Sequence, residues 1–208
     1  MKQFISLFLM LNSLIVFSQN EKYTKAMEKN LSLLDAAKTT QDFQTVANAF
    51  ARIGETEKNQ WLPYYWAGLA LSRAGWDDPK IDKEDNAQKI KAYCAKAEAI
   101  EKNSEIYSLL NMAATQEMMV DPQTRWQTYG QEASANLDTA MKLNPDNPRL
   151  YYLKGMSVFN TPVAFGGGKD NAKPLFEKAV ALYKMEKPKP LYPHWGRAQA
   201  EDMLAKCQ

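Results

Sequence analysis

Two ten-residue stretches, NSEIYSLLNM at residues 103–112 and NPRLYYLKGM at residues 147–156, follow one pattern. Each begins with Asn, has Tyr at its fifth position and ends in Met, and residues 61–68 (WLPYYWAG) fit the same frame. The matching tyrosines are 43 and 44 residues apart: Tyr64, Tyr107 and Tyr151. Recurrence at a fixed period of about 20 to 50 residues is typical of repeat proteins. This pattern decides the expected fold.

A second pattern follows each of these stretches. Four apolar residues recur with spacings of four, three and three, in three groups: Ile90, Cys94, Ala97 and Ile100; Ala133, Leu137, Ala140 and Leu143; Ala172, Phe176, Ala179 and Leu182. Such spacing places all four on one face of a helix, and Ala at the third position lets another helix approach closely. The sequence therefore predicts stacked helix pairs.

The two cysteines are expected to remain free. Cys94 lies at a predicted contact between two helices and is expected to be a small buried hydrophobe. We expect no disulfide with Cys207, the penultimate residue, where a chain usually frays.

Composition agrees with a helical protein. After residue 18 the chain has 26 Ala but only 10 Val and Ile together, the reverse of what a sheet uses. Turn signals divide it into nine expected helices, at residues 22–38, 41–56, 61–74, 83–101, 104–119, 123–143, 148–160, 170–185 and 194–206. A net charge of +2 and the absence of a basic run give no reason to expect nucleic acid. One His and two distant Cys cannot form a His- or Cys-rich metal site, and we expect no metal and no cofactor.

The first residues are typical of a signal peptide. Lys2 precedes an uncharged apolar run over residues 4–17, which is too short for a comfortable transmembrane span. We expect residues 1–18 to be removed after Ser18, and a retained membrane anchor is the alternative. The mature chain, residues 19–208, would then carry a charge of +1 and form a single domain. The predicted location is the periplasm or cell envelope, as a soluble exported protein.

The helix pairs resemble the tetratricopeptide repeat (TPR). That family carries an aromatic residue and Gly on the first helix and Ala-x3-Phe-x2-Ala on the second. Here Tyr64 with Gly68, Tyr151 with Gly155, and the group at residues 172–179 match. The usual period is about 34 residues, and the surplus here lies at residues 75–85, 121–130 and 161–169. Over residues 41–185 the resemblance implies an all-α, right-handed solenoid of about four TPR-like pairs, with extended interhelix loops and residues 194–206 as a capping helix.

No group of residues predicts an enzyme. His194, the single imidazole, is expected at the start of the last helix, as a surface or packing residue. Gly166, Gly167 and Gly168 with Lys169 lack the remaining positions of a phosphate loop and are expected to free the backbone for a turn. The acidic loop at residues 77–85 lacks the Gly and Glu of a calcium-binding EF-hand and is expected to be solvated.

Binding is the function that the resemblance implies. In such repeats the first helix of each pair lines the concave face, and the repeat frame gives these candidate contacts: Tyr65, Arg73, Met112, Gln116, Tyr152, Met156 and Asn160. Aromatic and Met side chains supply adaptable apolar contact, and Arg, Gln and Asn supply directional hydrogen bonds. The apolar members could equally be core residues. Trp76, Arg125, Trp126 and Tyr129 lie in the interhelix segments, where exposed aromatics would indicate a binding site and buried ones would close the stack.

Two functions are left open. The first is a noncatalytic envelope scaffold that recognises a protein or peptide partner through the concave face. The alternative is a helical small-molecule or lipid-binding component that delivers a ligand to envelope machinery. An open groove with polar ends would favour the scaffold, and an enclosed apolar cavity of a few hundred Å³ would favour the ligand carrier.

Overall fold

The structure is a computed structural model that describes residues 21–208, so the predicted signal peptide lies outside the described residues. The described part is built from helices and contains no strand, as the sequence predicts. A helix over residues 21–36 comes first. It is followed by α2 (Thr40–Glu57), α3 (Leu62–Asp77), α4 (Lys83–Glu98), α5 (Ser104–Met118), α6 (Pro122–Arg125), a π-helix (Trp126–Gly130), α7 (Gln131–Leu143), α8 (Pro148–Asn160), a 3-10 turn (Val163–Phe165), α9 (Lys169–Met185) and α10 (Arg197–Lys206).

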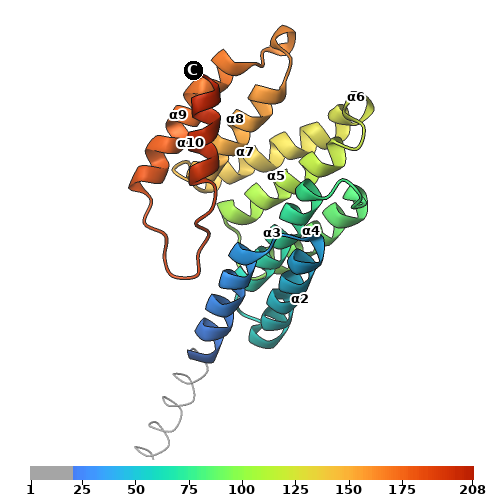
Figure 1. Cartoon of the computed structure of the whole chain (residues 1–208), viewed down its shortest axis with the longest axis vertical. Coiled ribbons are helices and arrows are strands. Elements are labelled where there is room, and N and C mark those ends of the chain that lie inside the picture. Colours follow the sequence, from blue (N-terminus) through green and yellow to red (C-terminus); the bar gives the residue numbers. More distant parts are fainter. Residues whose placement is uncertain (1–20) are drawn as a thin grey trace, which may run out of the picture.

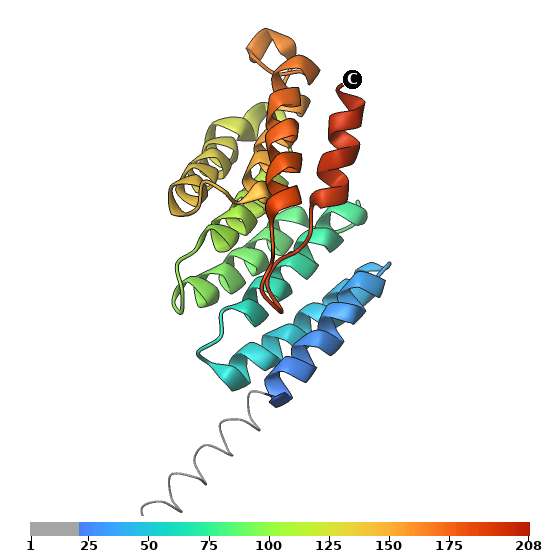
Figure 2. The ribbon, with the colours of Figure 1, turned by 90° about the vertical axis from the view of Figure 1, so that its left-hand side faces the viewer.

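Helices that are neighbours in sequence pack side by side. The chain climbs from the blue N-terminal helices at one end to the red α10 at the other (Figure 1). The pairs α2–α3, α3–α4, α4–α5, α5–α7, α8–α9 and α9–α10 are all in contact, whereas α8 meets α5 and α7 over a small area. The view turned by 90° shows the same progressive stacking (Figure 2). The α8–α10 part is therefore joined to the rest through a narrower junction.

Local sequence signals fix most helix ends. Thr39 and Asp42 form a reciprocal capping box at the start of α2, and Asp82 and Asn103 accept backbone N–H bonds at the starts of α4 and α5. Asn147 does the same for α8, with Pro148 at the first turn. Expected and observed ends consequently differ by about three residues at most.

Close helix contacts explain the repeated frame. A Cβ added at Gly68 would lie 2.8 Å from Leu109 Cδ2, and one at Gly155 would lie 2.6 Å from the Phe176 ring. Asn111 takes the corresponding place in α5, and its Nδ2 donates to the Ala133 carbonyl at 2.9 Å. The frame thus marks where the first helix of each pair meets the second.

The second-helix pattern is buried as predicted, with one clear exception. Ile90, Cys94, Ala140 and Phe176 are among its members with at most 1% exposure, but Leu143 is 41% exposed. Both cysteines are free, and burial raises the pKa of the Cys94 thiol. The expectation of fraying at Cys207 is wrong, because this residue is buried in a cluster with Phe176.

The last helix starts three residues later than predicted, so His194 does not lie at its first turn. Gly196 has φ of 101°, a left-handed conformation, and α10 begins only at Arg197. Residues 186–196 form an irregular segment, here called the strap, which crosses back to α3. Trp66 Nε1 donates to the Leu191 carbonyl at 2.9 Å, and Trp195 Nε1 donates to the Tyr65 hydroxyl at 2.7 Å. The strap therefore ties the end of the chain to the first predicted repeat.

Candidate ligand pocket

Two of the predicted concave-face residues lie inside the protein. Tyr65 and Gln116 are fully buried. Besides its bond from Trp195, Tyr65 donates to Glu105 Oε2 at 3.4 Å. Gln116 Oε1 accepts from Asn86 Nδ2 at 3.0 Å, and its Nε2 donates to the Ser72 carbonyl at 2.8 Å. The strap covers Tyr65, and helices α3 and α4 surround Gln116. Neither side chain could therefore contact a binding partner without a rearrangement of the protein.

The other predicted residues are nearer the surface. Met112 is partly buried against the main core, and Arg73 is partly exposed. Tyr152 and Met156 pack with Phe176 of α9 and Met203 of α10, so the last helix covers this part of the α8 face. Asn160 is exposed and donates to the Met156 carbonyl at 2.8 Å. These residues do not converge on one open groove, and their role as ligand contacts stays a prediction.

A pocket of about 350 Å³ lies beneath the strap. It is lined by the residue before α3, the start of α5 and the segment that precedes it, the end of α7, the start of α8 and the strap itself: Trp61, Glu101, Lys102, Asn103, Ser104, Glu105, Leu143, Asn144, Arg149, Glu186, Lys187, Pro188, Lys189, Tyr192 and Pro193. We call it the strap pocket. Its volume is at the lower end of the range for small-molecule sites, and its lining is amphipathic.

A buried ion cluster forms part of the wall of the strap pocket. Arg149, at 3% exposure, directs Nε to both carboxylate oxygens of Glu105 at 2.9 and 3.0 Å. Its Nη2 contacts Glu105 Oε1 at 2.8 Å and Glu186 Oε1 at 2.5 Å. The guanidinium also lies over the Tyr183 and Trp195 rings, at 6.0 and 5.9 Å from their centroids. Arg149 therefore joins α5, α8 and the strap.

Burial disfavours the charged forms of the residues in this cluster, and the ion pairs favour those charged forms again. Desolvation alone would lower the pKa of Arg149, but Glu105 and Glu186 outweigh that effect and raise it. Burial raises the pKa of the Glu105 carboxyl, although Arg149 opposes the shift by charge and by hydrogen bonding. Burial likewise raises the pKa of Tyr65, with the nearby Glu105 acting in the same direction. Arg149 therefore stays charged and needs carboxylate partners.

The rest of the lining combines apolar surfaces with three lysines and one further carboxylate, Glu101. The Trp61 and Tyr192 rings meet edge to face at a centroid distance of 5.6 Å, and the exposed Leu143 lies on the same pocket. Lys189 lies 5.4 Å from the Tyr192 ring centroid, and Lys102 and Lys187 complete the basic part of the lining. This arrangement suits a ligand that has an apolar body and an acidic group.

Sequence reasoning missed this site. The sequence signals for it are Arg149, a charged residue inside the NPRLYYLKGM frame, and the segment KPKPLYP at residues 187–193, which the sequence analysis interprets only as a turn. Leu143 was assigned to a buried helix face. Glu105 and Arg149 both stand third in their repeat stretches, 44 residues apart, so the repeat frame could have indicated that they face each other, whereas the strap lies outside that frame.

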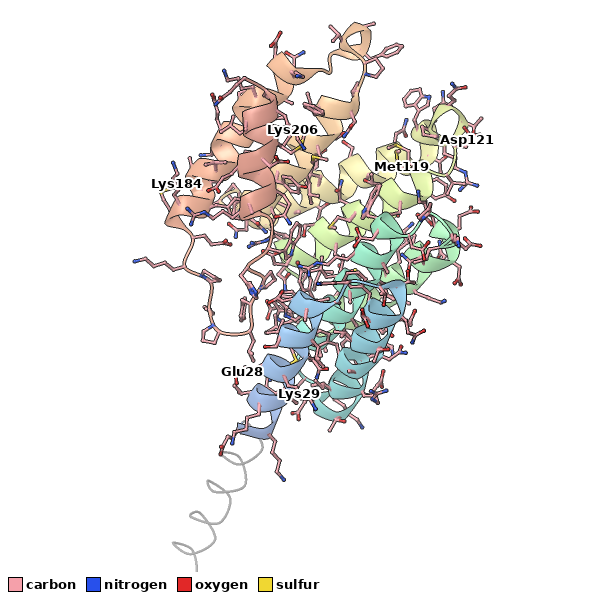
Figure 3. The ribbon with its side chains drawn as sticks, in the orientation of Figure 1. Glu28, Lys29, Met119, Asp121, Lys184 and Lys206 are labelled. Atoms are coloured by element: carbon pink, nitrogen blue, oxygen red, sulfur yellow. The ribbon has the colours of Figure 1, made fainter. Side chains whose placement is uncertain are left out.

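The interhelix loops form a second candidate surface. Trp76 is 44% exposed and Trp126 is 53% exposed, so by the exposure criterion these aromatics indicate a binding site. Arg125 links the two loops through Glu84 at 2.8 Å, and Trp126 begins the π-helix, an element that is frequent at functional sites. Figure 3 shows Met119 and Asp121 on this edge, away from Lys184 and Lys206 of α9 and α10. We call the surface around Trp76 and Trp126 the loop edge.

The remaining flagged residues have ordinary roles. His194 lies in the strap, where Nδ1 contacts the Tyr192 carbonyl at 3.0 Å and the ring packs 5.5 Å from the Trp66 ring centroid. Gly166 and Gly168 have φ of 81° and 95°, which confirms the predicted backbone turn. Among the described residues, no three His, Cys, Asp or Glu side chains are grouped so that they could hold a metal ion. None of the helices in residues 21–208 has the length and apolar character that a membrane span requires.

The sequence matches no family model, and a comparison with curated proteins finds no match. Among solved structures, the chain is similar to the HusA haemophore from Porphyromonas gingivalis, at 36% sequence identity. The superposition has a TM-score of 0.82 and covers 89% of this chain and 92% of the haemophore chain. A haemophore is by name a haem carrier. The fold is therefore shared with the haemophore over most of the length of both chains.

Proposed function

This chain belongs to the family of the HusA haemophore, and we propose that it is a noncatalytic carrier of haem or a related tetrapyrrole. The observation that supports this proposal is the 36% identity, extending over 92% of the haemophore chain. It favours the ligand-carrier alternative above the protein-binding scaffold that we first expected from the repeats.

We propose the strap pocket as the place where the ligand binds. A tetrapyrrole is a flat apolar ring that carries carboxylates, and the pocket offers the apolar faces of Trp61, Tyr192 and Leu143 beside lysines. At about 350 Å³ it would enclose one side of a macrocycle and leave the rest exposed. Partial exposure suits a carrier, because the next protein can then take hold of the ligand.

Titration of the full mature chain with haemin, followed by visible absorption, tests the function. We expect a saturable spectral change with one equivalent bound. The matched pair Leu143→Ser and Met185→Ser tests the site, because both residues are exposed but Leu143 alone lines the pocket. Losing an apolar contact of this size should weaken binding by about three- to tenfold for Leu143→Ser and leave Met185→Ser unchanged. If the wild type binds haemin and Leu143→Ser binds it equally well, the strap pocket is rejected as the site, but the carrier function is retained.

Export from the cytoplasm is part of the proposal. The apolar run at residues 4–17 supports it, as does the relationship to a haemophore. Amino-terminal sequencing of the protein isolated from its native cells should begin at Gln19. A start at Met1 would indicate a retained anchor.

The relationship to TPR proteins is proposed as well. The 43- and 44-residue spacing and the close approaches at Gly68 and Gly155 support it. An experimental structure in which the helix pairs superpose on consecutive TPR repeats with right-handed progression would establish it. Pairs that superpose only on the haemophore would reject it.

A protein partner is a second candidate function, favoured by the exposed Trp76 and Trp126 on the loop edge. A photo-cross-linking residue placed at position 126 should capture one defined protein in living cells. The same residue at position 185, which is exposed but lies on the far side at the end of α9, serves as the control. Equal capture at both positions would reject a dedicated partner surface.

A further inference from the structure

We propose that Arg149 selects ligands that carry a carboxylate, by exchanging the Glu186 carboxylate for that of the ligand. The exchange would also release the first residues of the strap, so that filling the pocket loosens its own cover. The identity of the ligand rests on the proposed function, since haem carries two propionate carboxylates. The exchange itself rests on the contacts of the ion cluster.

The two carboxylates that hold Arg149 are not equivalent. Glu105 is fixed by partners on several elements: it accepts from Asn147 Nδ2 at 2.8 Å and from the Tyr65 hydroxyl, in addition to three contacts with Arg149. Glu186 binds through its side chain only to Arg149 in the described part of the chain. Glu186 is therefore the partner that can leave.

Position also favours exchange at Glu186. Its side chain is 20% exposed, against 12% for Glu105 and 4% for Arg149, and all three line the strap pocket. A carboxylate that enters the pocket can thus reach the side of the guanidinium that Glu186 occupies. Lys187 and Lys189, on the same stretch of strap, would attract it.

Exchange keeps the buried charge compensated. Removing one partner of a buried ion pair is strongly destabilising because an uncompensated charge remains. When a ligand carboxylate replaces Glu186, Arg149 keeps two carboxylate partners and Glu186 moves into water. A neutral ligand offers no such replacement, so the ion cluster acts as a filter for acids.

The strap would loosen only near the exchanged residue. Its far half is held independently by the bonds from Trp66 to Leu191 and from Trp195 to Tyr65. In the described structure, Glu186 ties residues 186–190 to other elements through its contacts with Arg149 and Leu182, whereas Lys189 contacts Tyr192 within the strap itself, through its carbonyl and its ammonium group. Ligand binding should therefore mobilise residues 187–190 and leave residues 191–195 in place.

The test compares haemin with its dimethyl ester on three full-length mature proteins: wild type, Glu186→Gln and Glu101→Gln. Glu101 is the matched control, because it lines the same pocket but makes no contact with Arg149. Glu186→Gln removes the competing carboxylate and should raise haemin affinity about five- to tenfold. Glu101→Gln removes the same charge from the pocket lining but leaves both partners of Arg149 in place, so its gain in haemin affinity should be clearly smaller than that of Glu186→Gln. The ester should bind wild type at least tenfold more weakly than haemin and gain nothing from Glu186→Gln.

Any different result contradicts the proposed exchange of carboxylates at Arg149. Equal gains for Glu186→Gln and Glu101→Gln would mean that the pocket senses net charge alone. Unchanged or weaker haemin binding by Glu186→Gln, with wild-type binding intact, rejects the exchange and leaves the carrier function standing. If no variant binds haemin, the proposed function fails and the exchange with it. Amide hydrogen exchange supplies a second measurement: haemin should speed exchange at residues 187–190 with the ester having no effect, and slower exchange would contradict strap release.

Discussion

Two clusters of polar side chains are buried in this protein, and they compensate for the loss of water in different ways. The amide cluster of Ser72, Asn86 and Gln116 is neutral and lies where α3, α4 and α5 meet. The ion cluster of Glu105, Arg149 and Glu186 lies at the junction of α5, α8 and the strap. Both satisfy their hydrogen bonds, but the ion cluster lines the strap pocket, whereas the three residues of the amide cluster are buried among helices. The amide cluster holds helices together, and the ion cluster is the one that we propose for binding.

The amide cluster is enclosed on every side. A Cβ at Gly75 would lie 2.5 Å from both Asn86 Nδ2 and Gln116 Oε1, so the absence of a side chain there makes room for the amides. Each amide finds neutral partners, and no charge has to be desolvated. In the ion cluster, by contrast, two carboxylates and a guanidinium lose water, a cost that buried pairs recover only with good geometry.

The largest effect should come from Arg149→Met, which leaves Glu105 buried without its cation. We expect a loss of about 3–5 kcal/mol in the free energy of unfolding, measured by urea denaturation. The triple variant Arg149→Met, Glu105→Gln, Glu186→Gln should recover much of this loss because no uncompensated charge remains. A loss below about 1 kcal/mol for Arg149→Met would show that the cluster does not hold the junction.

Gln116→Leu should cost less, about 1–3 kcal/mol, because it leaves neutral groups unpaired: the Asn86 amide and the Ser72 carbonyl. Gln199→Leu is the control, since Gln199 is an exposed amide on α10, away from the amide cluster. Its cost should stay within about 0.5 kcal/mol. If urea denaturation gave the two variants the same free energy of unfolding, the hydrogen bonds of the buried amide cluster would not contribute to stability.

Trp195→Phe should cost about 1 kcal/mol through loss of the bond from its Nε1 to the Tyr65 hydroxyl. Tyr65 also contacts Glu105, so this variant tests how firmly the strap supports the ion cluster. Faster amide hydrogen exchange at residues 191–195 is the expected readout. Trp126→Phe, at an exposed site, should leave that exchange unchanged, and identical rates in both variants would argue against strap anchoring at Trp195.

The smallest effect concerns a charge outside both clusters, at the α2 capping box. The hydroxyl of Thr39 and the backbone N–H groups of Lys38 and Thr39 lower the pKa of Asp42 below its ordinary 3.8. Because the pKa is lowered by folding, the stabilisation is present above pH 3.8 and is lost as the pH falls through the folded value. The melting-temperature difference between wild type and Asp42→Asn should shrink from pH 5 to pH 2.5. A constant difference would contradict an ionic contribution from this cap.

Sequence patterns predicted the helices well, because caps, prolines and apolar periodicity act within a few residues. The Tyr64, Tyr107 and Tyr151 frame located the first helix of three pairs, and Gly68 and Gly155 marked close contacts that the structure confirms. The pattern failed at Leu143, which has helix-face spacing but no neighbouring helix to cover it. Periodicity identifies the face of a helix and says nothing of how far its partner extends.

The site was harder to predict because it depends on chain segments distant in sequence. Tyr65 is predicted as a contact on the concave face, but the structure buries it beneath residues 191–195, which were not expected to cover it. Glu105 and Arg149 are separated by one repeat period of 44 residues, so the frame held a signal for their contact that the sequence analysis did not use. Glu186 lies 37 residues from Arg149 and outside the frame, so no sequence signal predicts its contact.

The sequence by itself determined the all-helical character, the repeat frame and the shortage of metal-binding residues, since these depend on composition and short spacings. Only the tertiary structure decided that the strap folds back on α3 and closes a pocket around Arg149. The physical reason is that a buried charge is stable only where its partners converge, and convergence is a property of the packed chain.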